Sequence, residues 1–358
     1  MGNSRGRRLD YIDNLRWILV FLLILYHVCM AYNTWGEANY IFFDRSKIAG
    51  AVVTFISPWF MPAMFLLAGV SSRYSMNRRG IKVFMRERLL RLGVPLIFGI
   101  AVLNPVLSYV ADVTHNGYDG GYLAHYKVFF TKFTDLSGYD GGFALAHLWF
   151  IVVLLVISFI SCGVIGVIDR MSADTKEALR PVGRILMTIA ACASFDIKIM
   201  GKPLILYLFI FLIGYYLFSD QGFIAGLSKF KWIFVPVFIV SSAADAVLFN
   251  YIGGHALLNK ILALLSFISG VLALVSFGHD HLNKSCGLTR FCAKISYTFY
   301  IIHFPVVVLC QYLLSQTHMA SRVNLVLSIL ISYPLTLALC FVISKMRGAG
   351  ILVGMKNR

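Results

Sequence analysis

The sequence predicts an all-α polytopic membrane protein with about ten transmembrane helices, because of its composition, its long apolar runs and its distribution of basic residues. Of 358 residues, 59% are hydrophobic and 13% are charged, and the mean hydropathy is +0.78. Soluble domains carry roughly 25% charged residues. A water-soluble fold cannot bury so large an apolar fraction, so lipid must be the solvent for much of this chain.

Ten runs are apolar enough to be spans, since a membrane helix needs roughly 20 mainly apolar residues to satisfy its backbone hydrogen bonds in lipid. The run from Trp17 has no small-residue cleavage site, so it is predicted to be the first helix rather than a signal peptide. The fifth run contains Asp196 and Lys198 and the sixth is short, which leaves nine or eleven spans open. Together the ten form one membrane domain over residues 1–358, with spans near 15–34, 49–72, 93–111, 146–168, 184–200, 203–218, 232–249, 256–277, 293–315 and 321–345.

The basic residues predict the orientation of these spans. If the N-terminus is cytoplasmic, exterior segments hold only eight of the 32 Lys and Arg residues. Cytoplasmic loops of membrane proteins carry an excess of Lys and Arg, so both termini are expected to be cytoplasmic. The same bias accounts for the net charge of +16, and no nucleic-acid partner is expected.

Several other classes of site find little support in the sequence. The seven cysteines form no CxxC pair, and His279-Asp-His281 has no further close ligands, so we expect no metal. Nucleotide hydrolysis and hydride transfer are disfavoured because neither GxxxxGK[ST] nor GxGxxG occurs. The exterior segment 112–145 repeats Gly-Tyr-Asp-Gly-Gly at 117–121 and 138–142. This repeat predicts two similar turns, and a sugar-binding surface is the alternative.

Ionisable residues inside a membrane are costly and therefore mark candidate functional sites. Four of them lie within the predicted spans: His27, His147, Asp245 and His303. His27 is eleven residues beyond Arg16, about 16 Å along a helix, and His303 reaches a similar depth in its own span. The two histidines are thus predicted to share one level near the mid-plane, although the sequence does not show whether their helices are neighbours.

Arginines mark the cytoplasmic rim. Arg16 shares a helical face with His27, and Arg88 and Arg91 are three residues apart on a helix that enters the membrane. A phosphate-bearing ligand or anionic lipid headgroups could occupy such a rim.

Five motifs, in order along the chain, resemble the acyltransferase-3 family of membrane O-acyltransferases. They are Tyr11-Ile-Asp-Asn-Leu-Arg-Trp17 with Leu25-Tyr-His27, Phe60-Met-Pro-Ala-Met-Phe-Leu-Leu-Ala-Gly69, Phe84-Met-Arg-Glu-Arg-Leu-Leu-Arg-Leu-Gly-Val-Pro95, His147-Leu-Trp-Phe150 and Ser296-Tyr-Thr-Phe-Tyr-Ile-Ile-His303. The family often has Ser-Gly where this chain has Ala68-Gly69, so a serine role at Ala68 is not implied. The opening motif is similar to the glucan succinyltransferase branch.

The resemblance implies a ten-helix fold that takes acyl-CoA from the cytoplasmic side and acylates a hydroxyl of a glycan or lipid-linked sugar. Arg16, Arg88 and Arg91 would bind the phosphates of coenzyme A. His27 would act as general base, either directly or after accepting the acyl group itself. Donors to the oxyanion would come from His303, Trp149, Tyr297 or Tyr300, while His147 and Asp245 are further substrate-binding candidates.

Some choices stay open at this level. Acetyl-CoA and succinyl-CoA are both compatible donors, and neither the acceptor nor the oligomeric state is predicted. The expected location is a bacterial cytoplasmic membrane, in contact with its lipids. A secondary transporter or flippase is the main alternative, because transporters also place charged groups at mid-membrane depth.

Overall fold

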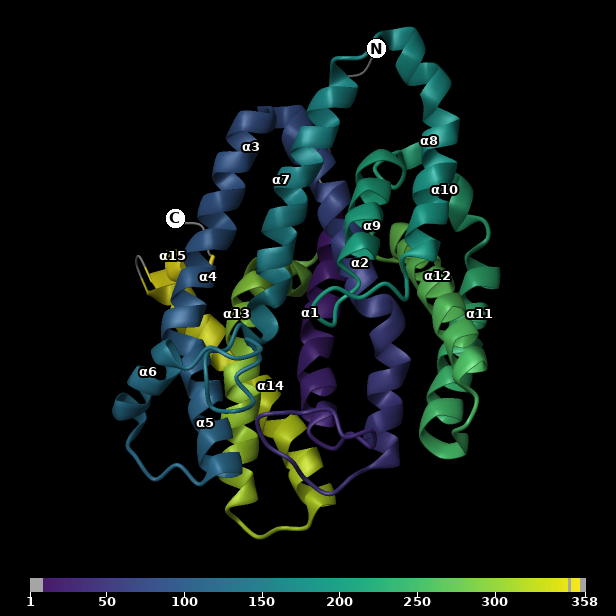
Figure 1. Ribbon diagram of the computed structural model, residues 1–358. Helices are drawn as coiled ribbons and strands as arrows, with labels where there is room; N and C mark the ends of the chain where they lie inside the picture. Colours follow the sequence, from purple (N-terminus) through teal and green to yellow (C-terminus); the bar gives the residue numbers. More distant parts are fainter. Residues whose placement is uncertain (1–8, 347–348, 355–358) are drawn as a thin grey trace.

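The computed structural model describes residues 9–346 and 349–354, and it consists of helices joined by loops (Figure 1). Within these residues β pairing is limited to one isolated bridge, between Ile199 and Lys202. Segments α9 (Leu204–Tyr216) and α10 (Gln221–Ser228) are bent by 102° and could form one broken span. Eight other segments of the described chain are long and apolar enough to cross a membrane: Asp10–Met30, Lys47–Arg79, Ile81–Asn116, Ala146–Asp169, Lys231–Ile252, Ala256–His281, Gly287–Ser315 and Ser321–Lys345. The predicted all-α polytopic fold is confirmed, with eight or nine candidate spans.

The run predicted as a span at 184–200 has a different structure. Helix α8 (Ala173–Ala193) ends at Ala193, and a turn leads to the Ile199–Lys202 bridge. Arg180 and Arg184 lie in the middle of α8, where their charges disfavour a position across lipid. These residues therefore form half of an amphipathic helix and a turn, because charge and turn geometry interrupt the apolar run.

Three helices form the centre of the bundle. Helix α1 (Asp10–Met30) packs against both α2 (Lys47–Arg79) and α13 (Gly287–Ser315). Helix α14 (Ser321–Lys345) covers α13, and the hairpin of α11 (Lys231–Val247) and α12 (Ala256–His281) lies against α2. Segments distant in the sequence thus meet around α1, as Figure 1 shows.

Helices α2 and α9 approach each other closely at two glycines. A Cβ at Gly69 would lie 2.0 Å from the Phe211 carbonyl oxygen, and one at Gly214 would lie 2.3 Å from that of Leu66. Small residues of this kind let helix backbones touch inside membranes. The contact fixes the end of α2 that leads into Ser71 and Ser72.

The third span, Ile81–Asn116, is a continuous but irregular helix. It joins α3 (Ile81–Arg88), α4 (Val94–Phe98) and α5 (Asn104–Asn116) through π-helical turns at Leu89–Gly93 and Gly99–Leu103. Each π turn ends two residues before a proline, Pro95 or Pro105. A proline removes a backbone donor and clashes with the carbonyl four residues earlier, which explains the local widening of the helix.

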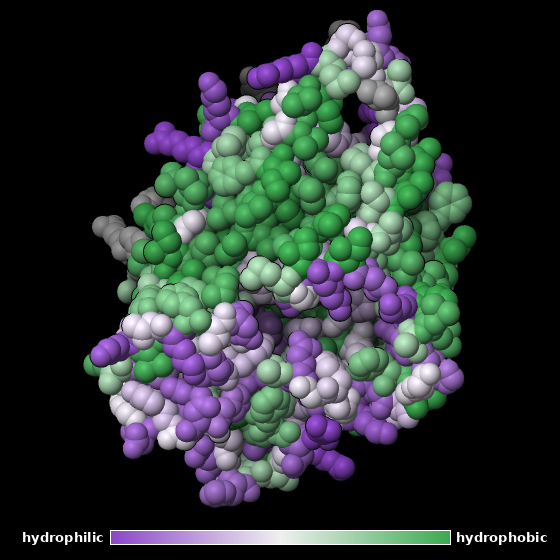
Figure 2. Space-filling model, in the orientation of Figure 1, coloured by the Kyte–Doolittle hydropathy of each residue, from purple (hydrophilic) through white to green (hydrophobic). Residues whose placement is uncertain are grey.

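The remaining helices border the site. Helix α7 (Trp149–Asp169) follows the short helical turn Ala146–Leu148, and α6 (Tyr122–Thr131) lies in the long loop after α5. Figure 2 shows a broad apolar band across one face of the molecule and a hydrophilic surface below it, where the long loops of Figure 1 gather. The surface is hollowed at the boundary between the two.

Candidate functional site

Three histidines from separate segments meet at the centre of the bundle. The ring of His27 on α1 is centred 5.3 Å from that of His303 on α13, and His147 is centred 5.2 Å from His303. We call these three residues the histidine cluster. The equal heights predicted for His27 and His303 agree with this geometry, and α1 and α13 are direct neighbours. His27 lies in the last turn of α1, because that helix ends at Met30 and not at residue 34.

Two of the three rings are held in a defined tautomer by backbone carbonyls. The Nδ1 of His303 is 2.7 Å from the Tyr300 carbonyl oxygen, and the Nε2 of His147 is 3.0 Å from that of Ile301. A carbonyl can only accept, so these nitrogens carry the hydrogens of the neutral rings. The opposite nitrogens, Nε2 of His303 and Nδ1 of His147, are buried and have no partner among the described residues. They are acceptors in the neutral rings, which argues against His303 as the oxyanion donor expected from the sequence.

His27 differs from the other two rings. It is partly exposed, and no described residue forms a hydrogen bond with its ring nitrogens. Its ring packs on Phe304 with 4.1 Å between centroids. An accessible imidazole with free nitrogens has what a proton acceptor in catalysis requires.

The position of His147 depends on a strained turn. Ala146 has φ +46°, a left-handed conformation that costs energy in a residue with a Cβ. The side-chain amide of Asn104 donates to the carbonyls of Ala144 (2.8 Å) and Leu145 (3.1 Å) and supports this turn. The Tyr300 hydroxyl donates to the His147 carbonyl, so it is not free to stabilise an oxyanion.

Two arginines meet a pair of serines at the end of α2. Arg16 donates to the Ser71 hydroxyl at 2.6 Å and to Asp13 at 2.9 Å, while Arg88 donates to Ser72 at 2.6 Å. The charges of Arg16 and Arg88 act on each other. We call Arg16, Arg88, Ser71 and Ser72 the arginine–serine cluster. It is a concentrated positive charge with hydroxyls that orient the guanidinium groups, suited to an anion.

Sequence reasoning missed Ser71 and Ser72. It considered a serine only at Ala68, where the family motif places one, although both serines follow on the same helix within four residues. The sequence did contain a signal. Because the second predicted span returns to the side on which the first begins, the polar residues near its end reach the level of Arg16.

Arg91 does not join the arginine–serine cluster. It is exposed, and no described residue forms a hydrogen bond or ion pair with it. Arg91 lies in the π turn Leu89–Gly93, which rotates less per residue than an α-helix. The step of three residues from Arg88 to Arg91 is therefore too small a rotation to place both side chains on one face of the helix.

Aromatic residues of α13 connect the two clusters. Tyr297 interacts electrostatically with Arg88, and its hydroxyl is buried without a partner in the described chain. The rings of Tyr297 and Tyr300 are centred 6.5 Å apart, and those of Tyr300 and His303 are 5.9 Å apart. Tyr297 is thus a free donor on a path from the arginines to the histidines.

Two other candidates, Asp245 and Trp149, differ in their distance from the histidine cluster. Asp245 is buried and accepts a hydrogen bond from Asn259 at 2.9 Å, within the α11–α12 hairpin. Trp149 is near the site, since it follows His147 by two residues and stacks on Tyr207 at 6.0 Å. Trp149 therefore adjoins His147 in the chain but has no ring contact with a histidine among the described residues, and Asp245 lies outside the histidine cluster.

The repeated turns at 117–121 and 138–142 are attached to the end of α5. The backbone N–H of Tyr118 donates to the Asp112 carbonyl at 3.2 Å, and the Asn116 side chain donates to the Asp140 carbonyl at 2.9 Å. His125 is buried against Asp112, with 3.1 Å between Nε2 and the carboxylate. These contacts favour the interpretation of the repeat as two structural turns.

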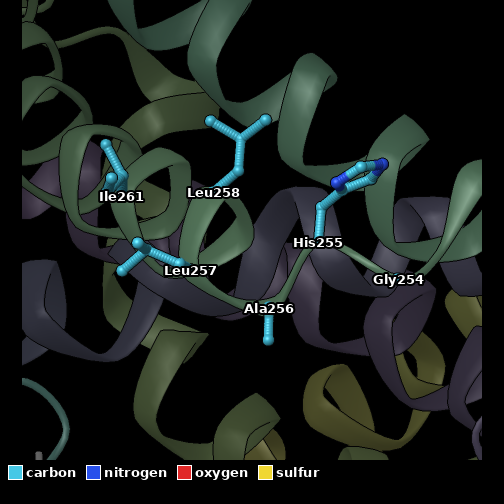
Figure 3. A pocket seen from close by; sticks show the side chains of 6 residues that line it. All are labelled: Gly254, His255, Ala256, Leu257, Leu258 and Ile261. Carbon is cyan, nitrogen blue, oxygen red and sulfur yellow. The ribbon is translucent and has the colours of Figure 1, made fainter.

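A shallow surface hollow of about 460 Å³ lies at the start of α12 (Figure 3). The side chains of His255, Leu258 and Ile261 point away from one another in this view. None of its lining residues belongs to either cluster, so it contributes nothing to the candidate site.

Comparisons with known proteins show the family of the chain. The acyltransferase-3 family model, described as an acyltransferase domain, matches residues 9–345. The chain is 23% identical over 337 residues to glucans biosynthesis protein C of Salmonella paratyphi B and of Salmonella dublin, and 24% identical to that of Salmonella schwarzengrund. Each alignment covers 85% of this chain and 84% of the relative. No solved structure matches the chain. The chain therefore belongs to the acyltransferase-3 family of membrane acyltransferases.

Proposed function

We propose that this membrane acyltransferase takes its acyl group from coenzyme A and transfers it to a hydroxyl of a glycan or lipid-linked sugar, with His27 as general base. The observation that carries the proposal is the accessible, unbonded ring of His27 within the histidine cluster. The relatives named for glucan biosynthesis support a glucan as the acceptor.

The arginine–serine cluster would bind the phosphates of the donor. Arg16 and His27 lie on the same helix, about 16 Å apart along its axis. The pantetheine arm would extend from Arg16 and Arg88 past Tyr297 toward His27, and the free Tyr297 hydroxyl is a suitable donor to its amide groups. This arrangement would bring the thioester to the histidine cluster.

The reaction then follows from the chemistry of the residues. The acceptor hydroxyl gives its proton to His27 as its oxygen attacks the thioester carbon. The carbonyl oxygen becomes an oxyanion, which needs a hydrogen-bond donor already in place. Tyr300 is occupied and His303 presents an acceptor, so Trp149, beside His147, and Tyr297, nearer the arginines, are the donors that stay available. Collapse of the tetrahedral intermediate breaks the carbon–sulfur bond, and the departing thiolate takes the proton from His27.

Donor binding is the first test. A ligand that binds the folded state raises its melting temperature in proportion to occupancy. We expect coenzyme A and its acyl thioesters to stabilise the detergent-purified protein, and Arg88→Ala to abolish most of this shift. Arg86→Ala is a matched control, because Arg86 is exposed on the same helix without a contact to Ser72. Absence of any shift in folded wild-type protein would favour the transporter alternative.

A further inference from the structure

The loop that follows α1 holds a carboxylate, Glu37, in a fixed turn. The side-chain oxygen of Asn33 accepts the backbone N–H groups of Gly36 at 2.8 Å and Glu37 at 3.0 Å. The Asn33 amide donates to the carbonyls of Met30 at 3.0 Å and Glu37 at 2.8 Å. Gly36 has φ +77°, a conformation that glycine adopts without strain. Because α1 ends at Met30, about 4.5 Å along the helix axis beyond His27, this turn is attached to the end of the helix that carries the histidine cluster.

Glu37 has one carboxylate oxygen held by the protein and one that is free. The indole N–H of Trp35 donates to Oε2 at 2.9 Å. The Trp35 ring in turn packs edge-on against Phe249, with 5.6 Å between centroids. The Glu37 side chain is exposed, and in the part of the chain that the structure describes its Oε1 accepts no hydrogen bond and no cation forms an ion pair with it. Oε1 is therefore available to a donor on a ligand.

Two tyrosines link Glu37 to the histidine cluster. Tyr26 directly precedes His27, and their rings are centred 5.4 Å apart. The charge of Glu37 acts on both Tyr26 and Tyr139, and Tyr26 also acts on Tyr139. Burial and, after it, the charge of Glu37 raise the pKa of Tyr139, so its hydroxyl remains protonated and can donate a hydrogen bond.

A series of aromatic rings connects Tyr139 to His27. Tyr139 packs on Tyr40 with 4.8 Å between centroids, Tyr40 on Phe304 with 5.5 Å, and Phe304 on His27 with 4.1 Å. The Tyr40 hydroxyl donates to the Ser137 carbonyl, which attaches the loop of Tyr139 to the loop after α1. These two loops therefore border the end of the histidine cluster that lies away from the arginine–serine cluster.

We infer that Glu37, together with Tyr26 and Tyr139, binds the acceptor sugar and thereby selects which of its hydroxyls is acylated. This inference rests on the proposed function. A sugar presents several hydroxyl donors around a ring whose C–H faces are apolar. Oε1 of Glu37 would accept charge-assisted hydrogen bonds from hydroxyls next to the reacting one, and the tyrosines would contact the ring and donate to its oxygens. With its neighbours bound, one hydroxyl would be oriented toward His27.

Acceptor kinetics test this role. The acceptor is a linear glucan oligosaccharide, and the donor is acetyl-CoA or succinyl-CoA, whichever stabilises the protein more, at saturation. We expect Glu37→Ala to raise the KM for the oligosaccharide by about ten- to a hundredfold, the usual contribution of a hydrogen bond to a charged group. NMR of the product should show the acyl group spread over more hydroxyls than with the wild type. The donor-induced thermal shift should not change, because Glu37 lies away from the arginine–serine cluster.

Two further variants define the cause. Glu37→Gln keeps the shape and one acceptor oxygen but loses the charge, so its KM should lie between those of the wild type and Glu37→Ala. Asp119→Ala is the matched control, since Asp119 is an exposed acid in the loop after α5 that forms no hydrogen bond or ion pair with the described residues. Its KM for the oligosaccharide should equal that of the wild type.

The alternatives give different results. An unchanged KM for the oligosaccharide and an unchanged acylation position in Glu37→Ala would overturn the inference. An equal rise in KM in Asp119→Ala would also overturn it, because the effect would then come from surface charge in general. Loss of the donor-induced thermal shift in Glu37→Ala would assign Glu37 a structural role instead. These outcomes leave the proposed function intact, whereas a wild type that binds donor but acylates no sugar would remove both.

Discussion

His27 and His147 each pack against His303, yet hydrogen bonding gives the three rings different expected roles. Backbone carbonyls hold His303 and His147, while His27 has both ring nitrogens free of described partners. General-base catalysis contributes typically 10²–10⁴-fold. We therefore expect His27→Ala to lower kcat by about that factor without changing the donor-induced thermal shift. Transfer of radiolabelled acyl groups to glucan measures this, and full activity in the folded variant would exclude His27 as the base.

Ser72 is expected to act on donor binding through Arg88. Loss of its hydroxyl removes the 2.6 Å hydrogen bond that orients the guanidinium. A hydrogen bond to a charged group contributes about 1.5–3 kcal/mol, so Ser72→Ala should raise the Kd for coenzyme A by about tenfold or more. Calorimetric titration with coenzyme A measures this. Ser75→Ala is the control, because Ser75 lies on the same helix but bonds only to Arg79. An unchanged Kd in Ser72→Ala would remove Ser72 from the donor site.

The sequence was informative about single polar residues and less so about their partners. His27, His303, His147 and Arg16 were identifiable because polar side chains are costly at membrane depth. Ser71 and Ser72 were not, because a serine is unremarkable until the fold shows what it contacts. The tautomers of the histidines likewise depend on carbonyls that only the packed structure positions.

Among the elements, α2 and α9 form the contact most sensitive to side-chain size. A Cβ at Gly214 would lie 2.3 Å from a backbone oxygen, which no rotamer change can relieve. Overpacking typically costs 1–3 kcal/mol, so Gly214→Ala should lower the free energy of unfolding by about that amount. Thermal unfolding in detergent measures the effect. Gly166→Ala on α7 is the control, since nothing lies within 4 Å of its added Cβ. Equal melting temperatures for both variants would contradict a tight α2–α9 contact.

Helices were predictable where an apolar run was long and uninterrupted. Residues 184–200 do not form one continuous helix, because residues 184–193 belong to α8 and the rest lead through a turn to the Ile199–Lys202 bridge. The π turns before Pro95 and Pro105 were not predicted, because proline alone does not specify how a helix adapts. The π turn Leu89–Gly93 orients Arg91 away from the face of Arg88, so Arg88 is the arginine that donates to Ser72.

At the scale of the whole molecule, the two clusters lie at different heights along α1. The arginine–serine cluster is near the start of α1, and the histidine cluster is in its last turn. If the start of α1 faces the cytoplasm, a cytoplasmic donor and an exterior acceptor can reach His27 from opposite sides without either substrate crossing the membrane.

This geometry requires the orientation that the basic residues predict, and Cys286 is a natural reporter of it. The side-chain amide of Asn14 donates to the carbonyls of Leu282 (2.7 Å) and Lys284 (2.9 Å), so the loop that carries Cys286 lies beside the start of α1. Cys286 is exposed, and hydrogen bonding from Thr289 lowers the pKa of its thiol, which favours the reactive thiolate.

A membrane-impermeant maleimide should therefore label Cys286 only after the cells are permeabilised. In a Cys286→Ser background, Lys127→Cys on the exposed surface of α6 should react in intact cells. Labelling of Cys286 from outside would place the arginine–serine cluster at the exterior, where coenzyme A is not supplied. The donor proposal would then fail even though the fold and the family stood, because only a cytoplasmic arginine–serine cluster can take its ligand from the coenzyme A pool.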